Sequence, residues 1–279
     1  MWRLSRLLLL LFLVRDCSTS TWQNPNRPFM SLDPNVHYNL STFTAPDAIQ
    51  NLASKKGPLL FIATTNHLYV LSASDLHVLQ DLITGPTNSS ECDLCSKCDM
   101  GSARPAQAED TDSKVLVLDP VEDLLYSCGS SLRGVCFLHE FDNYEILYSS
   151  FLFRAASNSP SLCPDCIASP LGTVVTPHVH LRSVLFYVAS TVDSNVAGSY
   201  GTTSVSIRRM LTSQDGFAAD FHSLTVLPLY MNTYPIHYVY TFSTDKYVFF
   251  LTVQPESGHS KNYHSRLVRL SATEQEMKR

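Results

Sequence analysis

Pairs of short apolar runs joined by turn-rich segments recur along the 279 residues of this chain, and this recurrence constrains its fold more than any other feature. Two such runs across a turn are the pattern of a β-hairpin. Successive pairs start 54 to 70 residues apart, which suits one four-stranded sheet per unit. The pairs are 59–63 with 68–71, 114–118 with 124–127, 184–189 with 204–210, and 238–242 with 247–253, and residues 266–270 begin a further strand.

Repeated antiparallel sheets of this size predict an all-β chain with the architecture of a β-propeller. A β-sandwich is the alternative, but its strands follow one another more evenly, about 8–12 residues apart. A sustained helical period is scarce in this sequence, and residues 45–53 are the best candidate for a short helix.

The N-terminus has the three parts of a secretory signal peptide. Arg3 and Arg6 give a basic start, residues 7–14 (LLLLLFLV) are wholly apolar, and small polar residues follow at 18–20. The apolar run is shorter than the roughly 20 residues that a membrane-spanning helix needs. We therefore expect residues 1–20 to be a signal peptide and residues 21–279 to form one domain that enters the secretory pathway.

Seven cysteines follow the signal peptide in three tight groups, and cysteines this close bind metal, exchange electrons or form disulfides. The oxidising secretory pathway favours disulfides. Zinc binding with help from His178 and His180 is an alternative that we do not favour, and we expect no metal and no cofactor. The groups are Cys92, Cys95 and Cys98, then Cys128 and Cys136, then Cys163 and Cys166.

Composition narrows the functional classes. The net charge of −5 and the lack of a basic patch argue against nucleic acid as a partner. No second long apolar run exists, so we expect no membrane span after processing.

Asn39 and Asn88 begin glycosylation sequons, which a secreted chain uses when they lie on surface loops. The sequence holds no glycine-rich phosphate loop, HRD or DFG motif, so we expect no kinase activity from this chain.

Seven segments of the chain carry a resemblance to a known family. They are TDSKVLVLDP (111–120), SCGSSLRGVCFLHE (127–140), CPDCIASPLGT (163–173), FYVAS (186–190), SVSIRRM (204–210), FFLTVQP (249–255) and RLVRLSATE (266–274). In this order they resemble the Sema domain of the hepatocyte growth factor receptor family. The resemblance covers nearly all residues after the signal peptide and is stronger to the member that binds macrophage-stimulating protein. It implies a partial seven-bladed β-propeller, roughly the first three to four blades, so that residues 21–279 would be an incomplete Sema domain.

The resemblance also implies a disulfide pattern. It pairs Cys128 with Cys136, with Gly129 and Gly134 easing the bend between them. It likewise pairs Cys163 with Cys166 and Cys92 with Cys98. The family partner of Cys95 is replaced by Phe151, so Cys95 is either a free thiol or pairs with Cys92 or Cys98 in an altered arrangement.

The family binds its ligand through propeller loops, and the corresponding loops here are 191–203 and 212–220. Asp193, Asn195, Tyr200 and Asp215 are the candidate contacts, with polar groups for orientation and an aromatic anchor. The implied partner is macrophage-stimulating protein or a related serine-protease-like growth factor, and the receptor could also pair as a homodimer. The implied location is the cell surface, or outside the cell if the short form is secreted.

Two other functions stay open. One is the Sema domain of a semaphorin or plexin, which would bind a different partner. The other is a secreted thiol-disulfide enzyme that uses Cys163 and Cys166, although Pro170 and Gly172 argue against the helix that usually activates such a pair. A partial propeller also exposes the flat sides of its terminal blades, so we expect the isolated chain to be poorly soluble.

Overall fold

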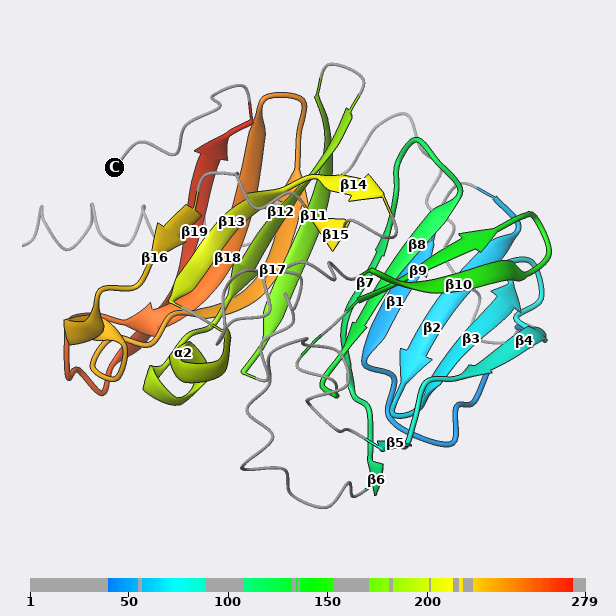
Figure 1. Cartoon of the computed structure of the whole chain (residues 1–279), viewed down its shortest axis with the longest axis horizontal. Coiled ribbons are helices and arrows are strands. Elements are labelled where there is room, and N and C mark those ends of the chain that lie inside the picture. Colours follow the sequence, from blue (N-terminus) through cyan, green and yellow to red (C-terminus); the bar gives the residue numbers. More distant parts are fainter. Residues whose placement is uncertain are drawn as a thin grey trace, which may run out of the picture. The chain divides into compact units, whose positions relative to one another are not determined.

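A computed structural model describes most of the compact unit Ser41–Arg279, and its sheets are shown in Figure 1. The described residues are 40–54, 57–88, 108–131, 134, 136–152, 171–180, 183–200, 202–212, 216–217 and 223–272. The expected signal peptide, residues 1–20, lies outside them. Within the described residues the chain is almost wholly β, with one short α-helix, α2 (Ser194–Tyr200), and one 3-10 turn, η3 (Pro228–Tyr230).

The first sheet is an antiparallel meander of four strands in the order β1 (Asn51–Ser54), β2 (Leu59–Thr64), β3 (His67–Ser72) and β4 (Val78–Ile83). The predicted hairpin is β2–β3, with Thr64 opposite His67. Its two-residue turn places Asn66 at φ 65°, a left-handed conformation that asparagine tolerates better than most residues.

The second sheet has the same layout, β7 (Ser113–Leu118), β8 (Leu124–Gly129), β9 (Cys136–Phe141) and β10 (Ile146–Leu152). Aspartate side chains close two of its turns. Asp119 Oδ1 accepts the N–H groups of residues 121 and 122, and Asp142 Oδ1 accepts those of residues 144 and 145. Short polar side chains of this kind mimic a backbone turn, which is why the strands end there.

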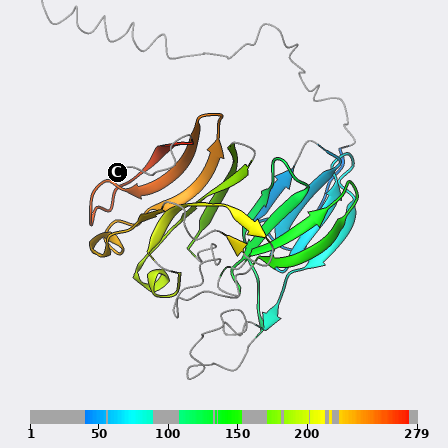
Figure 2. The same ribbon diagram turned by 45° about the horizontal axis from the view of Figure 1, so that its top comes forward.

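A small two-stranded ribbon, β5 (Thr87–Asn88) with β6 (Ala108–Glu109), stands apart from the four larger sheets (Figure 2). Asn88, which begins an expected glycosylation sequon, lies in β5 opposite Ala108.

The third sheet consists of β11 (Thr173–His180), β12 (Ser183–Ser190), β13 (Thr203–Arg208) and β16 (Ser223–Thr225). The expected strand 204–210 ends early, because the chain leaves the sheet after Arg208. It then forms a separate pair from β14 (Met210–Thr212) and β15 (Gly216–Phe217).

The fourth sheet has three strands, β17 (His237–Ser243), β18 (Tyr247–Pro255) and β19 (Tyr263–Ser271), in that order. The expected hairpin 238–242 with 247–253 and the expected strand at 266–270 are both confirmed. Among the described residues no strand pairs with the outer edge of β19 (Figure 1).

Successive sheets bury their apolar faces against one another. Phe61 and Leu125 share a core between the first and second sheets, Tyr126 and Phe186 one between the second and third, and a further core joins the third and fourth. The first strands of neighbouring sheets, β1, β7, β11 and β17, also contact one another in that order. This stacking of meanders is the arrangement of propeller blades, so the predicted partial β-propeller is confirmed.

The expected helix at 45–53 is wrong. Residues 45–50 have no regular structure, and Asn51–Ser54 is strand β1, paired with β2. Tertiary contacts override the weak local periodicity here, since Asn51 Nδ2 donates at 3.0 Å to both the carbonyl and the hydroxyl oxygen of Ser113 in the next sheet.

Candidate functional site

A network of polar side chains holds the seam between the first two sheets. The Asn66 side-chain oxygen accepts the N–H of Thr111 at 2.7 Å, and its amide nitrogen donates to Asp110 Oδ1 at 2.8 Å. The N–H of Asn66 also donates to the Thr111 carbonyl at 2.9 Å. One turn residue therefore ties the β2–β3 hairpin to the segment that leads into β7.

Gln50 and Asp112 continue this network. The Gln50 amide nitrogen donates to Asp112 Oδ1 at 2.8 Å and to Thr65 Oγ1 at 3.0 Å. The hydrogen bond from Gln50, assisted by the nearby Lys114 ammonium, holds the pKa of Asp112 below its ordinary value. Asp112 is thus an ionised structural acceptor at neutral pH and not a proton donor.

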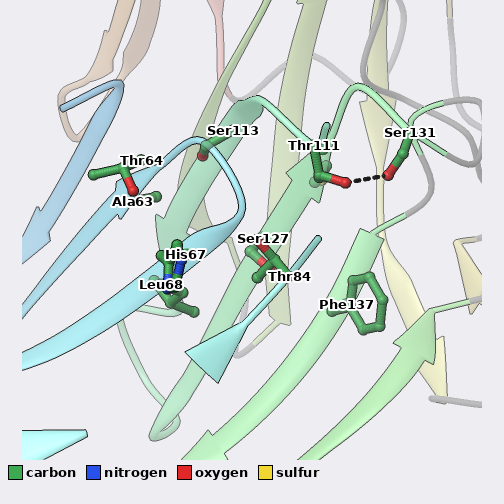
Figure 3. A pocket seen from close by; sticks show the side chains of 12 residues that line it. Ala63, Thr64, His67, Leu68, Thr84, Thr111, Ser113, Ser127, Ser131 and Phe137 are labelled. Carbon is green, nitrogen blue, oxygen red and sulfur yellow. Dashed lines mark hydrogen bonds between the residues drawn. The ribbon is translucent and has the colours of Figure 1, made fainter. Parts of the chain in front are cut away.

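A small pocket lies beside this seam (Figure 3). Its walls come from the end of β2, the start of β3, the start of β7 and strands β8 and β9. The hydroxyl groups of Thr111 and Ser131 form a hydrogen bond of 2.8 Å on one side of the pocket. The volume that water centres can occupy is about 30 Å³. That is room for one or two waters and not for an organic ligand.

His139 is a buried histidine in β9 whose ring contacts Ser127, one of the residues that line the pocket, and sequence reasoning missed it. Its ring nitrogens lie 2.7 Å from Ser127 Oγ and 2.7 Å from Ser149 Oγ, so the strands on both sides supply partners. Burial lowers the pKa of His139 to about 4. The ring is neutral at physiological pH and serves as a cross-strand hydrogen-bonding group. A His flanked by strand residues carries no sequence signal of such a role.

Cys128 and Cys136 form a disulfide between β8 and β9, with their Cα atoms 4.1 Å apart and directly opposite in the register. Gly134 in the loop between them has φ 76°, which fits the expected bend. Gly129 has a different role, because a Cβ on it would overlap the methyl group of Thr111. The two other expected pairs, Cys92 with Cys98 and Cys163 with Cys166, lie outside the described residues. Cys95 lies outside them as well.

Two of the four expected ligand contacts have described side chains. Asp193 caps helix α2, with its Oδ1 accepting the N–H of Val196 at 2.8 Å. Asn195 is exposed on the helix surface. Tyr200 is the last residue of α2, and only its backbone is described, whereas Asp215 lies outside the described residues, as does the Asn39 sequon. The expected loop is therefore partly helical, with Asp193 positioning it and Asn195 available for contact.

The β17–β19 sheet presents an exposed face that is rich in apolar side chains. Its open face carries two rows of side chains across the three strands, Tyr240–Leu251–Leu267 and Phe242–Phe249–Arg269. The rings of Phe242 and Phe249 stack with centroids 4.9 Å apart. Tyr240 is 61% exposed and Leu267 58% exposed. A contiguous face of this kind is typical of an interaction surface.

Among the described residues, no three His, Cys, Asp or Glu side chains gather where they could hold a metal ion. No helix in that part of the chain is long and apolar enough to cross a membrane.

No protein-family model matches the chain. Among solved structures, the plexin A4 full extracellular region, domains 1 to 8, matches with a TM-score of 0.58 and 24% identity, covering 81% of this chain and 26% of that one. The fold is that of a Sema domain. A plexin A4 structure with domains 1 to 10 matches at the same TM-score and identity, with 20% of it covered. Drosophila plexin A in complex with semaphorin 1b matches more weakly, with a TM-score of 0.43, 14% identity, and 81% of this chain and 39% of that chain covered.

The two plexin A4 matches bear out the Sema fold that the sequence motifs imply, and at 24% identity they concern the fold alone. The chain spans 26% of the length of the plexin A4 region that it matches, with domains 1 to 8.

Proposed function

We propose that this chain is an extracellular protein-recognition module, the ligand-binding part of a receptor of the hepatocyte growth factor receptor family. The observation that supports the proposal is the Sema-like propeller fold, which matches plexin A4 over 81% of this chain with a TM-score of 0.58. The ordered motifs and cysteine spacing of the sequence favour this family. The partner is then macrophage-stimulating protein or a related serine-protease-like growth factor.

The surface around α2 is the proposed contact. Asp193 fixes the first turn of the helix through its hydrogen bond to Val196, and the Asn232 side chain accepts the N–H of Ser194 at 3.2 Å. A helix held at its start in this way presents Asn195 in a fixed direction. Rigid presentation lowers the ordering cost of binding a partner. We treat the chain as a binding module and not as an enzyme, in keeping with its lack of kinase motifs.

A plexin-type or semaphorin-type Sema domain is the second candidate. The TM-score of 0.58 with plexin A4 over 81% of this chain favours it. The two candidates differ in partner, because a growth-factor receptor binds a protease-like ligand and a plexin-type domain binds another Sema protein.

Surface plasmon resonance with the immobilised chain separates them. We expect saturable binding of macrophage-stimulating protein and none of a semaphorin ectodomain, whereas the reverse result would favour the second candidate. Asn195→Arg should weaken growth-factor binding by about tenfold, since a long charged side chain disturbs a packed contact. Asp245→Arg is the control, because Asp245 is an exposed residue in the β17–β18 turn, outside the α2 surface, and the same arginine side chain is introduced there. Equal loss in both variants would contradict a contact at α2.

A further inference from the structure

The loop between β16 and β17 exposes four consecutive apolar or aromatic residues. Leu227, Leu229 and Tyr230 are 51%, 73% and 46% exposed, and Pro228 between them is exposed as well. Single exposed apolar residues are ordinary on a protein surface, whereas a contiguous group of them is typical of an interaction site. We call residues 227–230 (LPLY) the η3 knob, because they contain the 3-10 turn η3.

Local hydrogen bonds fix the conformation of the η3 knob. The N–H of Tyr230 donates to the Leu227 carbonyl at 2.8 Å, which closes the turn. The Thr233 hydroxyl donates to the Leu229 carbonyl at 2.9 Å. Met231, directly after the knob, is buried and anchors it to the body of the protein. A surface element whose conformation is set before binding loses little entropy when a partner covers it.

Hydrogen bonds also join both ends of the knob to the segment that contains α2. Before the knob, the N–H of Val226 donates at 2.9 Å to the carbonyl of Thr202, which lies two positions after the last residue of α2. After the knob, the Asn232 side chain accepts the N–H of Ser194, the first residue of α2, at 3.2 Å. The η3 knob and the α2 surface are therefore neighbouring parts of one surface.

The two segments that form this surface carry no charged residue. Helix α2 (SNVAGSY, 194–200) contains no Asp, Glu, Lys or Arg, and neither does the stretch from residue 223 to residue 236. Charged residues make up 16% of the whole chain. Depletion of charge together with exposed aromatic and large apolar side chains is the composition of the centre of a protein–protein interface.

We propose that the η3 knob is the apolar anchor of the α2 surface and inserts into an uncharged, apolar depression on a folded protein partner. The inference rests on the proposed function, because it assigns further residues to the same contact. Tyr230 is of a residue type that is enriched among binding hot spots, and Leu229 is the most exposed residue of the knob. Asn195 on α2 then supplies a polar contact beside this anchor.

A membrane surface fits the knob less well than a protein does. Membrane-surface segments combine apolar side chains with Lys or Arg, which are attracted to anionic lipid headgroups. Neither α2 nor residues 223–236 contain Lys or Arg. The chemistry of the surface therefore favours a protein partner.

Surface plasmon resonance with the immobilised chain and macrophage-stimulating protein tests the anchor. Leu229→Ser should weaken binding by at least about tenfold, because a leucine side chain that is buried on binding loses its apolar contact. Leu147→Ser is the matched control, since Leu147 is 62% exposed in β10, outside this surface, and should leave the affinity unchanged. Native affinity in Leu229→Ser would overturn the anchor and leave the growth factor as the partner.

Ionic strength distinguishes an apolar anchor from a contact made by ion pairs. The dissociation rate of the complex should change by less than about twofold between about 50 mM and 500 mM NaCl, because salt screens charges and not apolar contacts. A larger acceleration by salt would assign the contact to ion pairs and overturn the proposal.

Hydroxyl-radical footprinting gives a readout that needs no substitution. Binding of macrophage-stimulating protein should lower the oxidation of Leu229 and Tyr230, because the centre of an interface excludes water. The oxidation of Leu147 should stay unchanged. Equal oxidation of Leu229 in the free chain and in the complex would overturn the proposal.

Further outcomes separate failure of the anchor from failure of the proposed function. If a semaphorin ectodomain binds in place of the growth factor, the proposed function is wrong, and Leu229→Ser then decides the anchor against the semaphorin. A tenfold loss of that binding supports the anchor, and no loss overturns it. Binding of neither protein overturns both proposals.

Two other occupants of the knob are checked with the same variant. Co-sedimentation of the chain with phosphatidylcholine vesicles that Leu229→Ser abolishes would assign the knob to a lipid surface. A dimer in light scattering that Leu229→Ser dissociates would assign it to a second copy of this chain. Either result would overturn the proposal of a protein partner of another kind.

Discussion

The side-chain oxygen of Asn66 accepts the backbone N–H of Thr111 at 2.7 Å, so a residue of the first sheet's central turn holds the chain where the second sheet begins. The two residues are 45 positions apart in the sequence. Asn66 adopts φ 65°, so both its conformation and its side chain suit this place. Asn66 therefore stabilises the seam between the first two blades both through its left-handed backbone conformation and through its side-chain hydrogen bonds.

Replacing Asn66 separates these two contributions. Asn66→Gly removes the side-chain bonds but keeps the left-handed backbone free of strain, and it should lower the free energy of unfolding by about 1–3 kcal/mol. Asn66→Ala loses the same bonds and adds about 1 kcal/mol of backbone strain. Urea unfolding of both variants measures the difference. Equal losses would show that the conformation of residue 66 is unimportant.

The disulfide between Cys128 and Cys136 closes a short loop within the second sheet. Replacing both by alanine removes the cross-link, which for a loop of this length stabilises by about 2–3 kcal/mol through the unfolded chain. Thermal and urea unfolding of the double variant should show this loss. If the described disulfide is the main redox-sensitive element, a reducing agent should destabilise the native chain more than the variant. An unchanged stability in the variant would contradict the structural role.

The methyl group of Thr111 fills the space into which a side chain at position 129 would project. A Cβ on residue 129 would overlap the Thr111 methyl group, so Gly129→Ala should cost about 1–3 kcal/mol. Thr111→Ser removes that methyl and keeps the hydroxyl that bonds Ser131 at 2.8 Å. The double variant should therefore recover most of the loss caused by Gly129→Ala. Strict additivity in the double-mutant cycle would show that the two residues do not clash.

His139 makes stability depend on pH. Burial depresses its folded pKa to about 4, below the ordinary value of 6.5. Between those values the unfolded chain binds a proton and the folded chain does not, so the free energy of unfolding falls as the pH falls. The contribution is fully present above about pH 6.5 and is lost progressively toward pH 4, by about 3 kcal/mol in all.

Urea unfolding at about pH 7.5 and about pH 4.5 checks this expectation. His139→Gln keeps a polar group beside Ser127 and Ser149, but glutamine does not titrate. Between these two pH values the free energy of unfolding of the variant should therefore change by about 2–3 kcal/mol less than that of the native chain. Parallel pH profiles for the two proteins would show that His139 does not bind a proton on unfolding.

Hairpins with local signals could be predicted from the sequence. Residues 59–71 show two apolar runs around a polar turn, and the structure pairs them as β2 and β3. The outer strand β4 was missed, because Val78–Ile83 is largely exposed and its sequence (VLQDLI) reads equally well as a loop. Edge strands owe their structure to the neighbour they pair with, and a single sequence does not show that neighbour.

The candidate contact surface was predictable only in part. The segment 191–203 was expected to be a loop, and helix α2 within it has a weak helical sequence, SNVAGSY. An aspartate at the start is a helix-capping signal that could have revealed it. The open face of β17–β19 was harder to foresee, because the nearly continuous apolar run of β18 (YVFFLTV) is typical of a strand that is buried on both faces.

The most direct test of the central claim is the affinity of the folded chain for macrophage-stimulating protein, measured by surface plasmon resonance beside a semaphorin ectodomain. The account predicts saturable growth-factor binding that Asn195→Arg weakens about tenfold and Asp245→Arg leaves unchanged. Binding of the semaphorin alone, or of neither protein by a cooperatively folded chain, would contradict it.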